Sequence, residues 1–121
     1  MNLGDVFRRS WSFHKVCIVI SDPRQDPINV VVVTCTSASF DRSCILTKAE
    51  CLPLQHDSYI SYQHSKIWAD ADLEKDLAAG GLTITHTLDA AALKKIHDGA
   101  AISQHLATGH HQILDAQGLL P

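Results

Sequence analysis

The sequence predicts an α+β fold, with a barrel of short antiparallel strands in the first half of the chain and helices in the second half. Two observations support this division. Short runs rich in β-branched residues recur over residues 1–69, and no helical pattern separates them. After residue 69 the apolar residues take helical spacing. We expect a single domain over residues 1–121, because a chain of this length has no room for two independent cores.

The barrel strands are expected from the type and the length of the apolar runs. Residues 16–21 and 29–36 are rich in β-branched side chains, which lose χ1 freedom in a helix and fit a pleated sheet. Residues 22–27 lie between these runs and contain two prolines and two aspartates, so we expect a loop there. Weaker signals predict three further strands, at residues 4–7, 44–47 and 59–62.

The second half of the chain begins with a short helix and one more strand. An aspartate, Asp70 or Asp72, is expected to cap a helix near residues 70–79, which the glycines at 80–81 end. Residues 82–87 alternate apolar and polar side chains and predict a half-exposed strand that joins the barrel.

Two helices are expected after that strand. Asp89 opens a helix near residues 89–107, in which Gly99 permits a kink or a break because glycine costs about 1 kcal/mol relative to alanine. A last helix is expected near residues 110–118, ending at Gly118.

The composition excludes several classes of protein. With 45% hydrophobic and 19% charged residues the chain can bury a core, which excludes a disordered tail. No apolar run approaches the roughly 20 residues of a membrane-spanning helix. Since the first residues also lack the pattern of a secretory signal, we expect a cytoplasmic protein with no membrane partner. Its four cysteines, two of them inside apolar runs, are then expected to be reduced and mostly buried.

The charge is unevenly distributed. The net charge is −3, and residues 70–121 have seven acidic side chains against three basic ones. A protein that binds nucleic acid across a broad face is usually basic overall, so any contact with a phosphate backbone is expected at a local patch. The first fifteen residues contain such a patch, formed by Arg8, Arg9, His14 and Lys15.

No sequence motif predicts a cofactor or a metal. There is no Gly-rich phosphate loop, no nucleophile elbow and no Cys or His spacing of a zinc site. The eight histidines form no recognisable ligand set, so a metal-dependent enzyme is the weakest of the functional hypotheses. Asp57 and Ser58 precede a predicted strand and are interpreted as turn residues.

Three segments, in order, resemble the MazF/PemK family of toxins. Gly-Asp-Val-Phe at residues 4–7 is similar to the family's opening G-D-[IVL]-[VW]. Residues 14–21 resemble its second strand, R-P-[AV]-[LV]-V-[LV]-S, and residues 31–37 resemble its third strand, which ends in P-[IC]-T-[ST]. The resemblance covers about the first 65 residues. It implies an SH3-like barrel that cleaves single-stranded RNA without a metal, forms homodimers and is neutralised by an antitoxin protein.

The resemblance also assigns candidate site residues. The family's catalytic arginine falls on Lys15 and its catalytic threonine on Thr36. Beside them, His14 is a candidate base or acid, and Thr36 and Ser37 have hydroxyl groups that can donate to a phosphate oxygen. The other candidates for binding RNA are Arg8, Arg9 and Trp11. Adjacent residues of a strand point to opposite faces, so only one of the two arginines is expected to line a given groove.

A non-catalytic barrel that binds other proteins is the alternative hypothesis. Lysine replaces the family's arginine at position 15, and lysine offers a point charge where arginine offers a planar fork. The loop between the first two strands is short, and the second half of the chain is acidic. Each candidate also has an ordinary structural explanation, such as a solvated lysine at a strand end or a tryptophan in the core.

Overall fold

The computed structural model describes residues 1–10, 12–38 and 40–121, and of residues 12–14 it describes the backbone alone. Within this part of the chain the fold is α+β, as the sequence predicts, with six strands and three helices. The strands are β1 (Asp5–Arg9), β2 (Ser12–Val19), β3 (Val30–Thr36), β4 (Ile45–Leu46), β5 (Ser58–Trp68) and β6 (Leu82–Thr87). The helices are α1 (Asp70–Ala78), α2 (Ala90–Ile102) and α3 (Thr108–Ala116).

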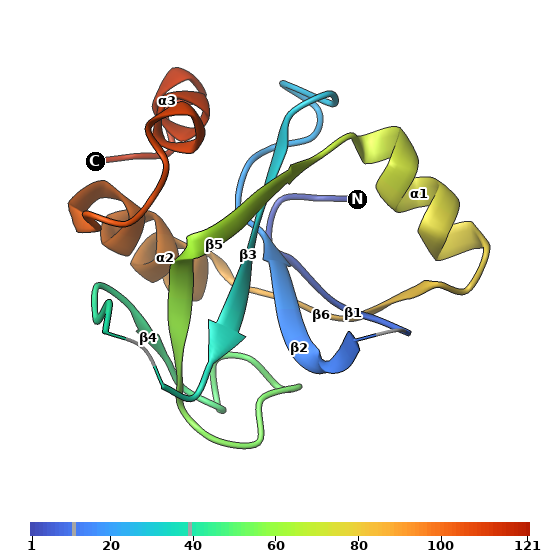
Figure 1. Ribbon diagram of the computed structural model, residues 1–121, viewed down its shortest axis with the longest axis horizontal. Coiled ribbons are helices and arrows are strands. Elements are labelled where there is room, and N and C mark those ends of the chain that lie inside the picture. The colour runs from blue at the N-terminus through green and yellow to red at the C-terminus, as the bar shows by residue number, and fades with distance from the viewer. Residues whose placement is uncertain (11, 39) are drawn as a thin grey trace.

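The strands form one curled antiparallel sheet in the order β4-β5-β3-β2-β1-β6 (Figure 1). Each pair of neighbouring strands is antiparallel. The sheet curls into a half-barrel, with α2 and α3 on one side of the strands and α1 on the other (Figure 1). The strand β6 pairs with β1 and so brings residues from the second half of the chain to the edge of the sheet.

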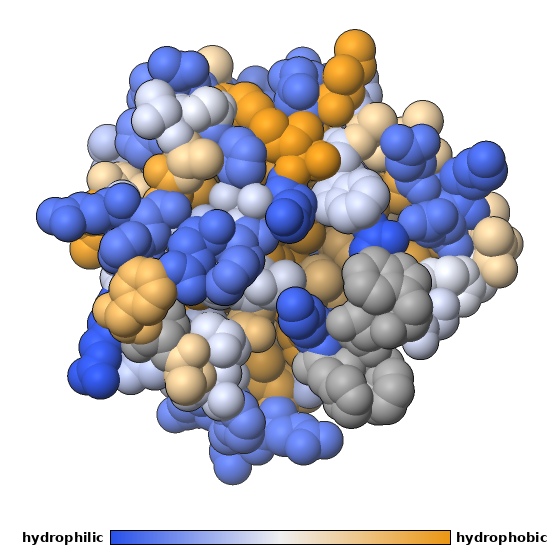
Figure 2. Space-filling model, viewed as in Figure 1, coloured by the Kyte–Doolittle hydropathy of each residue, from blue (hydrophilic) through white to orange (hydrophobic). Residues whose placement is uncertain are grey.

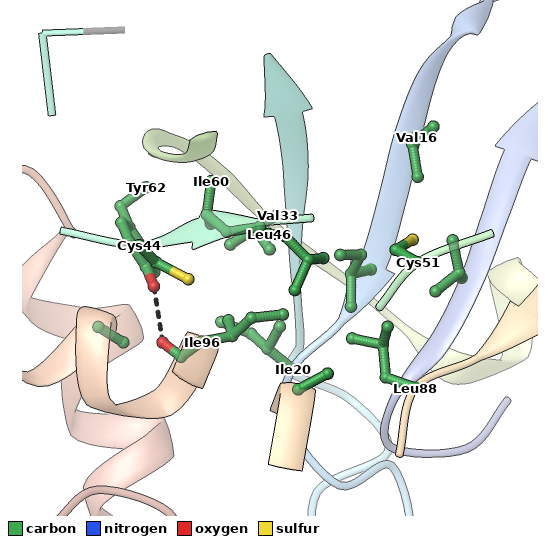
Figure 3. Packing of buried hydrophobic residues seen from close by; sticks show 14 of the residues in the cluster. Val16, Ile20, Val33, Cys44, Leu46, Cys51, Ile60, Tyr62, Leu88 and Ile96 are labelled. Carbon is green, nitrogen blue, oxygen red and sulfur yellow. Dashed lines mark hydrogen bonds between the residues drawn. The ribbon is translucent and has the colours of Figure 1, made fainter. Parts of the chain in front are cut away.

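The concave interior of the half-barrel holds the larger apolar cluster. Alternate residues of the strands point into it, because side chains along a strand alternate between the two faces of the sheet. The valines at 31 and 33 of β3 and the apolar side chains of α2 and α3 meet there, as Figure 3 shows for the centre of the cluster. Its fully buried members include Ile18, Ile20, Leu46, Ile60, Tyr62, Ile96 and Leu114.

The opposite face of the same strands has a smaller cluster. Val30 and Val32 of β3 pack there with Phe7 of β1, Leu73 of α1 and Leu82. Helix α1 packs against one part of this face through Leu73, and further along the face the side chains of Lys15, His64 and Lys66 are exposed. The sheet therefore has a covered face toward α2 and α3 and an open face beyond α1.

The starts of the first two helices differ from each other. Asp89 caps α2 as expected, since its side chain accepts a hydrogen bond of 2.8 Å from the backbone N–H of Ala92. The predicted aspartate cap of the first helix is wrong, because the N-cap is Ala69, with no side-chain cap hydrogen bond. Asp70 and Asp72 lie instead in the first turn of α1, where negative charge stabilises the helix dipole.

Further elements differ from the sequence prediction in their bounds, among them β2, which begins at Ser12 and not at residue 16. Strand β5 runs to Trp68, six residues beyond its predicted end at residue 62. Helix α2 ends at Ile102 and not near residue 107, and it continues through Gly99 without a break. Gly99 is required by packing: a Cβ there would meet the hydroxyl of Tyr62 and would come within 2.7 Å of the Cβ of Cys44.

All four cysteines are free, and Cys17, Cys44 and Cys51 are buried, which confirms the predicted state of the thiols. Burial raises the pKa of Cys44 and of Cys51 to about 11. In the part of the chain that the structure describes, none of the helices is both long enough and apolar enough to span a membrane.

Candidate functional site

Three of the predicted site residues line a single cavity. Lys15, Thr36 and Ser37 border a space of about 320 Å³ at the end of β3, which we call the Lys15 cavity. The other residues that line it come from β3, from the loop that follows it and from β5: Thr34, Cys35, Ala38, Ser61, Gln63 and His64.

The pairing of β2 with β3 explains this grouping. The antiparallel register sets Cys17 opposite Thr34. Lys15 lies two residues before Cys17 in β2, and Thr36 lies two residues after Thr34 in β3. Because the strands are antiparallel, the two residues come together at the same end of the pair. Lys15 is exposed, so its ammonium group is available to a ligand in the cavity.

The two hydroxyl groups are placed differently. The hydroxyl of Thr36 donates a 3.0 Å hydrogen bond to the carbonyl oxygen of Ala38, within the turn that ends β3. The side chain of Ser37 is exposed at the border of the cavity. Ser37 can thus donate directly to a bound oxygen, whereas Thr36 must first rotate away from its backbone partner.

His64, which is not among the residues predicted from the sequence, also lines the Lys15 cavity. The Nδ1 atom of this exposed histidine lies 2.7 Å from the hydroxyl oxygen of Ser61, a buried residue. The contact holds the ring in place and leaves Nε2 free to exchange a proton. Strand β5 has an irregularity at this point, since Thr34 pairs with Ser61 but Val32 pairs with Lys66. The extra residues of β5 include His64, and a bulge of this kind redirects side chains.

A second cavity, of about 270 Å³, adjoins the first. We call it the Arg8 cavity; it shares Cys35, Thr36 and Ser37 with the Lys15 cavity. Its remaining border comes from β1, β2, the segment before β5 and the first residue of β5: Arg8, Val16, Pro53, Leu54, Gln55, His56 and Ser58.

The guanidinium group of Arg8 is only partly satisfied. Its Nη2 donates a 2.8 Å hydrogen bond to the carbonyl oxygen of Pro53. Its Nε is buried and has no hydrogen-bond partner within the described residues. A buried donor without a partner costs free energy, so this atom is a position at which a ligand oxygen would be favourable.

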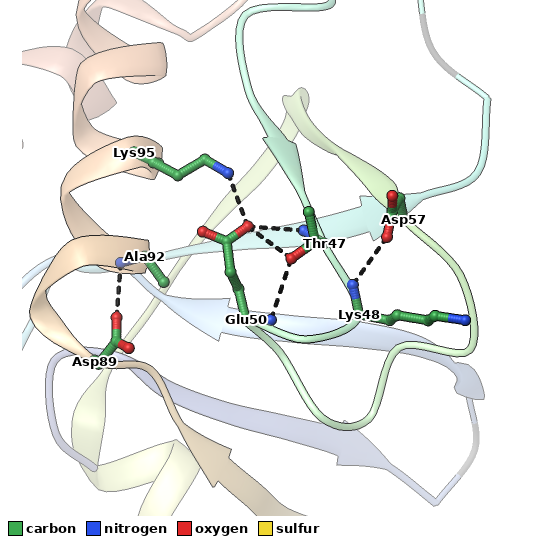
Figure 4. Close-up of polar contacts among 7 residues, drawn as sticks. All are labelled: Thr47, Lys48, Glu50, Asp57, Asp89, Ala92 and Lys95. Atoms are coloured by element: carbon green, nitrogen blue, oxygen red, sulfur yellow. Dashed lines mark hydrogen bonds and ion pairs between the residues drawn. The ribbon is translucent and has the colours of Figure 1, made fainter.

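Part of the lining of the Arg8 cavity belongs to a tethered loop, residues 47–57, whose anchoring contacts are drawn in Figure 4. Glu50 accepts hydrogen bonds from the backbone N–H and the hydroxyl of Thr47, and it pairs with Lys95 of α2 at 2.7 Å. These bonds, the one to Lys95 above all, lower the pKa of the Glu50 carboxyl. At the far end of the loop, Asp57 accepts from the backbone N–H of Lys48 at 3.1 Å. Residues 47–57 are therefore fixed at both ends.

A third space lies on the open face of the sheet and we call it the Trp68 groove. It measures about 300 Å³ and has an apolar floor with basic side chains around it (Figure 2). The guanidinium of Arg9 lies 4.3 Å from the centre of the Trp68 ring and pairs with Asp76 at 2.8 Å. The lining residues are Phe7, Arg9, Lys15, Cys17, Val32, Thr34, His64, Lys66 and Trp68.

The predicted residues thus divide between the two faces. Arg8 borders the Arg8 cavity and Arg9 borders the Trp68 groove, in keeping with the opposite directions of neighbouring side chains in a strand. Lys15 belongs to both the Lys15 cavity and the Trp68 groove. Trp11 lies outside the described residues, as does the side chain of His14.

The described residues contain no group of three His, Cys, Asp or Glu side chains that could hold a metal ion. The chemistry available in the Lys15 cavity is that of a cation, an imidazole and several hydroxyls, among them those of Thr36 and Ser37. In comparisons with known proteins, the sequence matches no protein-family model and no curated protein.

Proposed function

We propose that this chain is a growth-inhibiting toxin of the MazF/PemK kind, an endoribonuclease that cleaves single-stranded RNA without a metal ion. The observation that supports the proposal best is the Lys15 cavity. Two sequence segments that resemble the family, residues 14–21 and 31–37, contribute Lys15, Thr36 and Ser37 to one space, beside a histidine. The curled antiparallel sheet is compatible with the SH3-like barrel of that family.

The reaction is an attack of the RNA on itself. The 2′-hydroxyl of one nucleotide attacks the adjacent phosphorus, the bond from phosphorus to the 5′-oxygen breaks, and the products have a 2′,3′-cyclic phosphate and a 5′-hydroxyl. A base must take the proton of the 2′-hydroxyl and an acid must give one to the leaving oxygen. In our proposal His64 is the base and His14 the acid. Lys15 stabilises the charge that develops on the phosphorane, and Ser37 and Thr36 donate to its oxygens.

The Trp68 groove supplies a surface for the bases next to the cut. Its apolar floor can receive the flat face of a base, and Lys15, Lys66 and Arg9 provide positive charge at its edge. The groove shares Lys15, Thr34 and His64 with the Lys15 cavity, so an RNA strand can occupy both. Single-stranded RNA is the proposed substrate. An antitoxin protein and a second copy of the chain are proposed as partners on the resemblance alone.

Cleavage of a single-stranded RNA in the presence of EDTA tests the proposed activity. We expect the wild-type protein to cut the RNA and the Lys15→Ala/Thr36→Ala double variant to leave it intact. Lys75→Ala is the matched control, because Lys75 is an exposed lysine of α1 away from the cavity. Intact RNA with every protein, each shown to be folded by circular dichroism, would reject the activity and leave the non-catalytic interaction module as the description.

A growth assay tests the proposed biological role separately. Controlled expression of the wild-type protein is expected to arrest bacterial growth, and expression of the same double variant at equal level is expected to permit it. Equal growth with both proteins would contradict a toxic activity at this site.

A further inference from the structure

The Arg8 cavity has the features of an anion site. Among the residues that line it, Arg8 has a permanent positive charge and none is acidic. Most of the exposed lining is polar, and Val16 and Leu54, which are almost fully buried, contribute apolar atoms to it. A charged ligand group that the cavity partly encloses loses part of its water, which makes its interaction with the guanidinium stronger than it would be in bulk water.

Arg8 can offer a donor to this anion without losing its present bond. Nη2 donates to Pro53, whereas the buried Nε has no hydrogen-bond partner among the described residues. On the same side of the guanidinium, the second N–H of Nη2 and the Nε–H together form the planar fork that binds carboxylate or phosphate oxygens. The bond to Pro53 fixes the plane of this fork and thereby prepares the group for a ligand.

His56 supplies a second group to the lining of the cavity. Its Nδ1 lies 3.2 Å from the carbonyl oxygen of Asp57, and a carbonyl oxygen only accepts, so Nδ1 is the protonated nitrogen of the ring. Nε2 then remains available on an exposed ring, where it can donate to an anion once the ring is protonated. Ser58 reinforces this arrangement, because its hydroxyl donates to the carbonyl oxygen of His56 at 3.1 Å.

We infer that the Arg8 cavity binds a phosphate group, held by the Nε–H of Arg8 and by His56. Its volume of about 270 Å³ is several times the roughly 30 Å³ of one water molecule, so it can hold a phosphate together with part of a sugar. It meets the Lys15 cavity at Thr36 and Ser37. The occupant is therefore the phosphodiester next to the cleaved one in a single-stranded RNA. This identification of the occupant rests on the proposed function, whereas the phosphate site itself does not.

Titration of the protein with inorganic phosphate at constant ionic strength tests the site without any cleavage. The signal to follow is the Nε–H resonance of Arg8 in ¹⁵N nuclear magnetic resonance spectra. We expect a saturable shift, and an affinity about tenfold weaker in Arg8→Gln, since a hydrogen bond to a charged group is lost. The imidazole resonances report phosphate binding to that variant. Arg24→Gln is the matched control, because Arg24 is exposed and does not line the cavity.

Two further variants distinguish loss of the phosphate contact from loss of the fold. Arg8→Lys keeps the charge without the fork, and His56→Gln removes the imidazole from an exposed position. Both are expected to weaken phosphate binding while the spectrum of the remaining residues is preserved. An unsaturable shift in the wild-type protein, or equal affinity in Arg8→Gln, Arg8→Lys and His56→Gln, would overturn the site.

A second arm of the experiment identifies the source of the phosphate. A dinucleoside monophosphate, which has one phosphodiester and no terminal phosphate, is expected to displace inorganic phosphate from the cavity. Failure to displace it would overturn the assignment to RNA and indicate a site for free or terminal phosphate. RNA cleavage is measured apart from binding: we expect Arg8→Gln to raise KM about tenfold with little change in kcat, as for a group that binds substrate and transition state equally. Phosphate binding with intact RNA would reject the ribonuclease and keep the site.

Discussion

The covered and open faces of the sheet differ in what their side chains do. On the covered face, alternate residues of the strands lie in the cluster that α2 and α3 complete, and most are fully buried. On the open face, the same strands present Lys15, His64 and Lys66 to solvent around an apolar floor. The covered face is therefore expected to determine the stability of the fold, and the open face its chemistry. The Arg8 and Lys15 cavities lie where the two faces meet, at the end of β3.

The substitution with the largest expected effect on activity is Lys15→Ala. Loss of a group that stabilises a developing charge typically lowers kcat by about 10²–10³-fold. Because Lys15 is exposed, the free energy of unfolding should change by less than about 0.5 kcal/mol. The two measurements are the rate of RNA cleavage and a urea unfolding curve. A large loss of stability, or cleavage at the rate of Lys75→Ala, would contradict the separation of the two faces.

On the covered face the largest expected effect is that of Gly99→Ala. The new Cβ would come within 2.9 Å of the carbonyl oxygen of Ser43 and would also meet Tyr62. Overpacking of this kind typically costs about 1–3 kcal/mol, which exceeds the gain of about 1 kcal/mol in helix propensity. We expect a net loss of stability, measured as a lower urea midpoint.

A matched glycine makes this comparison sharper. At Gly109 of α3, no atom of the described residues outside its own turns of helix lies within 4 Å of the position that a Cβ would take. Gly109→Ala should therefore be neutral or stabilising, because only the gain in helix propensity remains. Similar unfolding midpoints for Gly99→Ala and Gly109→Ala would contradict the close packing of α2 against β5 at Gly99.

A smaller effect on stability is expected for Tyr62→Phe. The hydroxyl of Tyr62 donates a 2.6 Å hydrogen bond to the carbonyl oxygen of Ile96, and this bond connects β5 to α2 (Figure 3). Its loss should lower the free energy of unfolding by about 1 kcal/mol. The double variant Tyr62→Phe/Gly99→Ala should lose less stability than the two single variants lose together. The reason is that the tyrosine oxygen, which Tyr62→Phe removes, is one of the atoms in the clash. Full additivity in a double-mutant cycle would contradict the contact.

The smallest expected effect is a dependence of stability on pH through His97. This buried histidine donates from Nε2 to the carbonyl oxygen of Ile20 at 2.8 Å, and its burial lowers its pKa despite that bond and the nearby Asp98. The unfolded chain, whose histidines titrate near pH 6.5, then binds the proton more readily than the folded chain. The contribution of His97 to the free energy of unfolding is therefore fully present above about pH 6.5 and declines as the pH falls.

His97→Gln is the variant that isolates this contribution, because glutamine can still donate to Ile20 but does not titrate. Between pH 7 and pH 5 the free energy of unfolding should fall less steeply in the variant than in the wild type. A part of the slope should remain, since burial also lowers the pKa of His110. Equal slopes in the two proteins would show that His97 does not contribute to the pH dependence of stability.

Much of the fold follows from local patterns in the sequence. The runs of valine and isoleucine in β2 and β3 and the alternation in β6 identify strands without tertiary information. The end of β5 was missed because residues 63–68 contain polar side chains at several positions on both faces, so no strict alternation marks them. The length of α2 was overestimated because its end depends on a tertiary contact, the 2.6 Å hydrogen bond from Ser103 to Asp41.

The candidate site was accessible to sequence reasoning only in part. Lys15 and Thr36 could be chosen because the segments around them resemble a family, and the register of β2 with β3 brings them together. His64 and His56 could not be chosen, since each is one of eight histidines in the chain and gains its position from the pairing of β5 or from the tethered loop. Ser58 was interpreted as a turn residue, and it is buried at the border of the Arg8 cavity.

The measurement that tests the central claim most directly is the cleavage, in EDTA, of an RNA in which one nucleotide at the cut lacks its 2′-hydroxyl. We expect the wild-type protein to cut the all-ribose RNA into products with a 2′,3′-cyclic phosphate and a 5′-hydroxyl. The substituted RNA is expected to remain intact at that position. Equal cutting of the two RNAs, or no cutting of either, would contradict a metal-free ribonuclease in the Lys15 cavity.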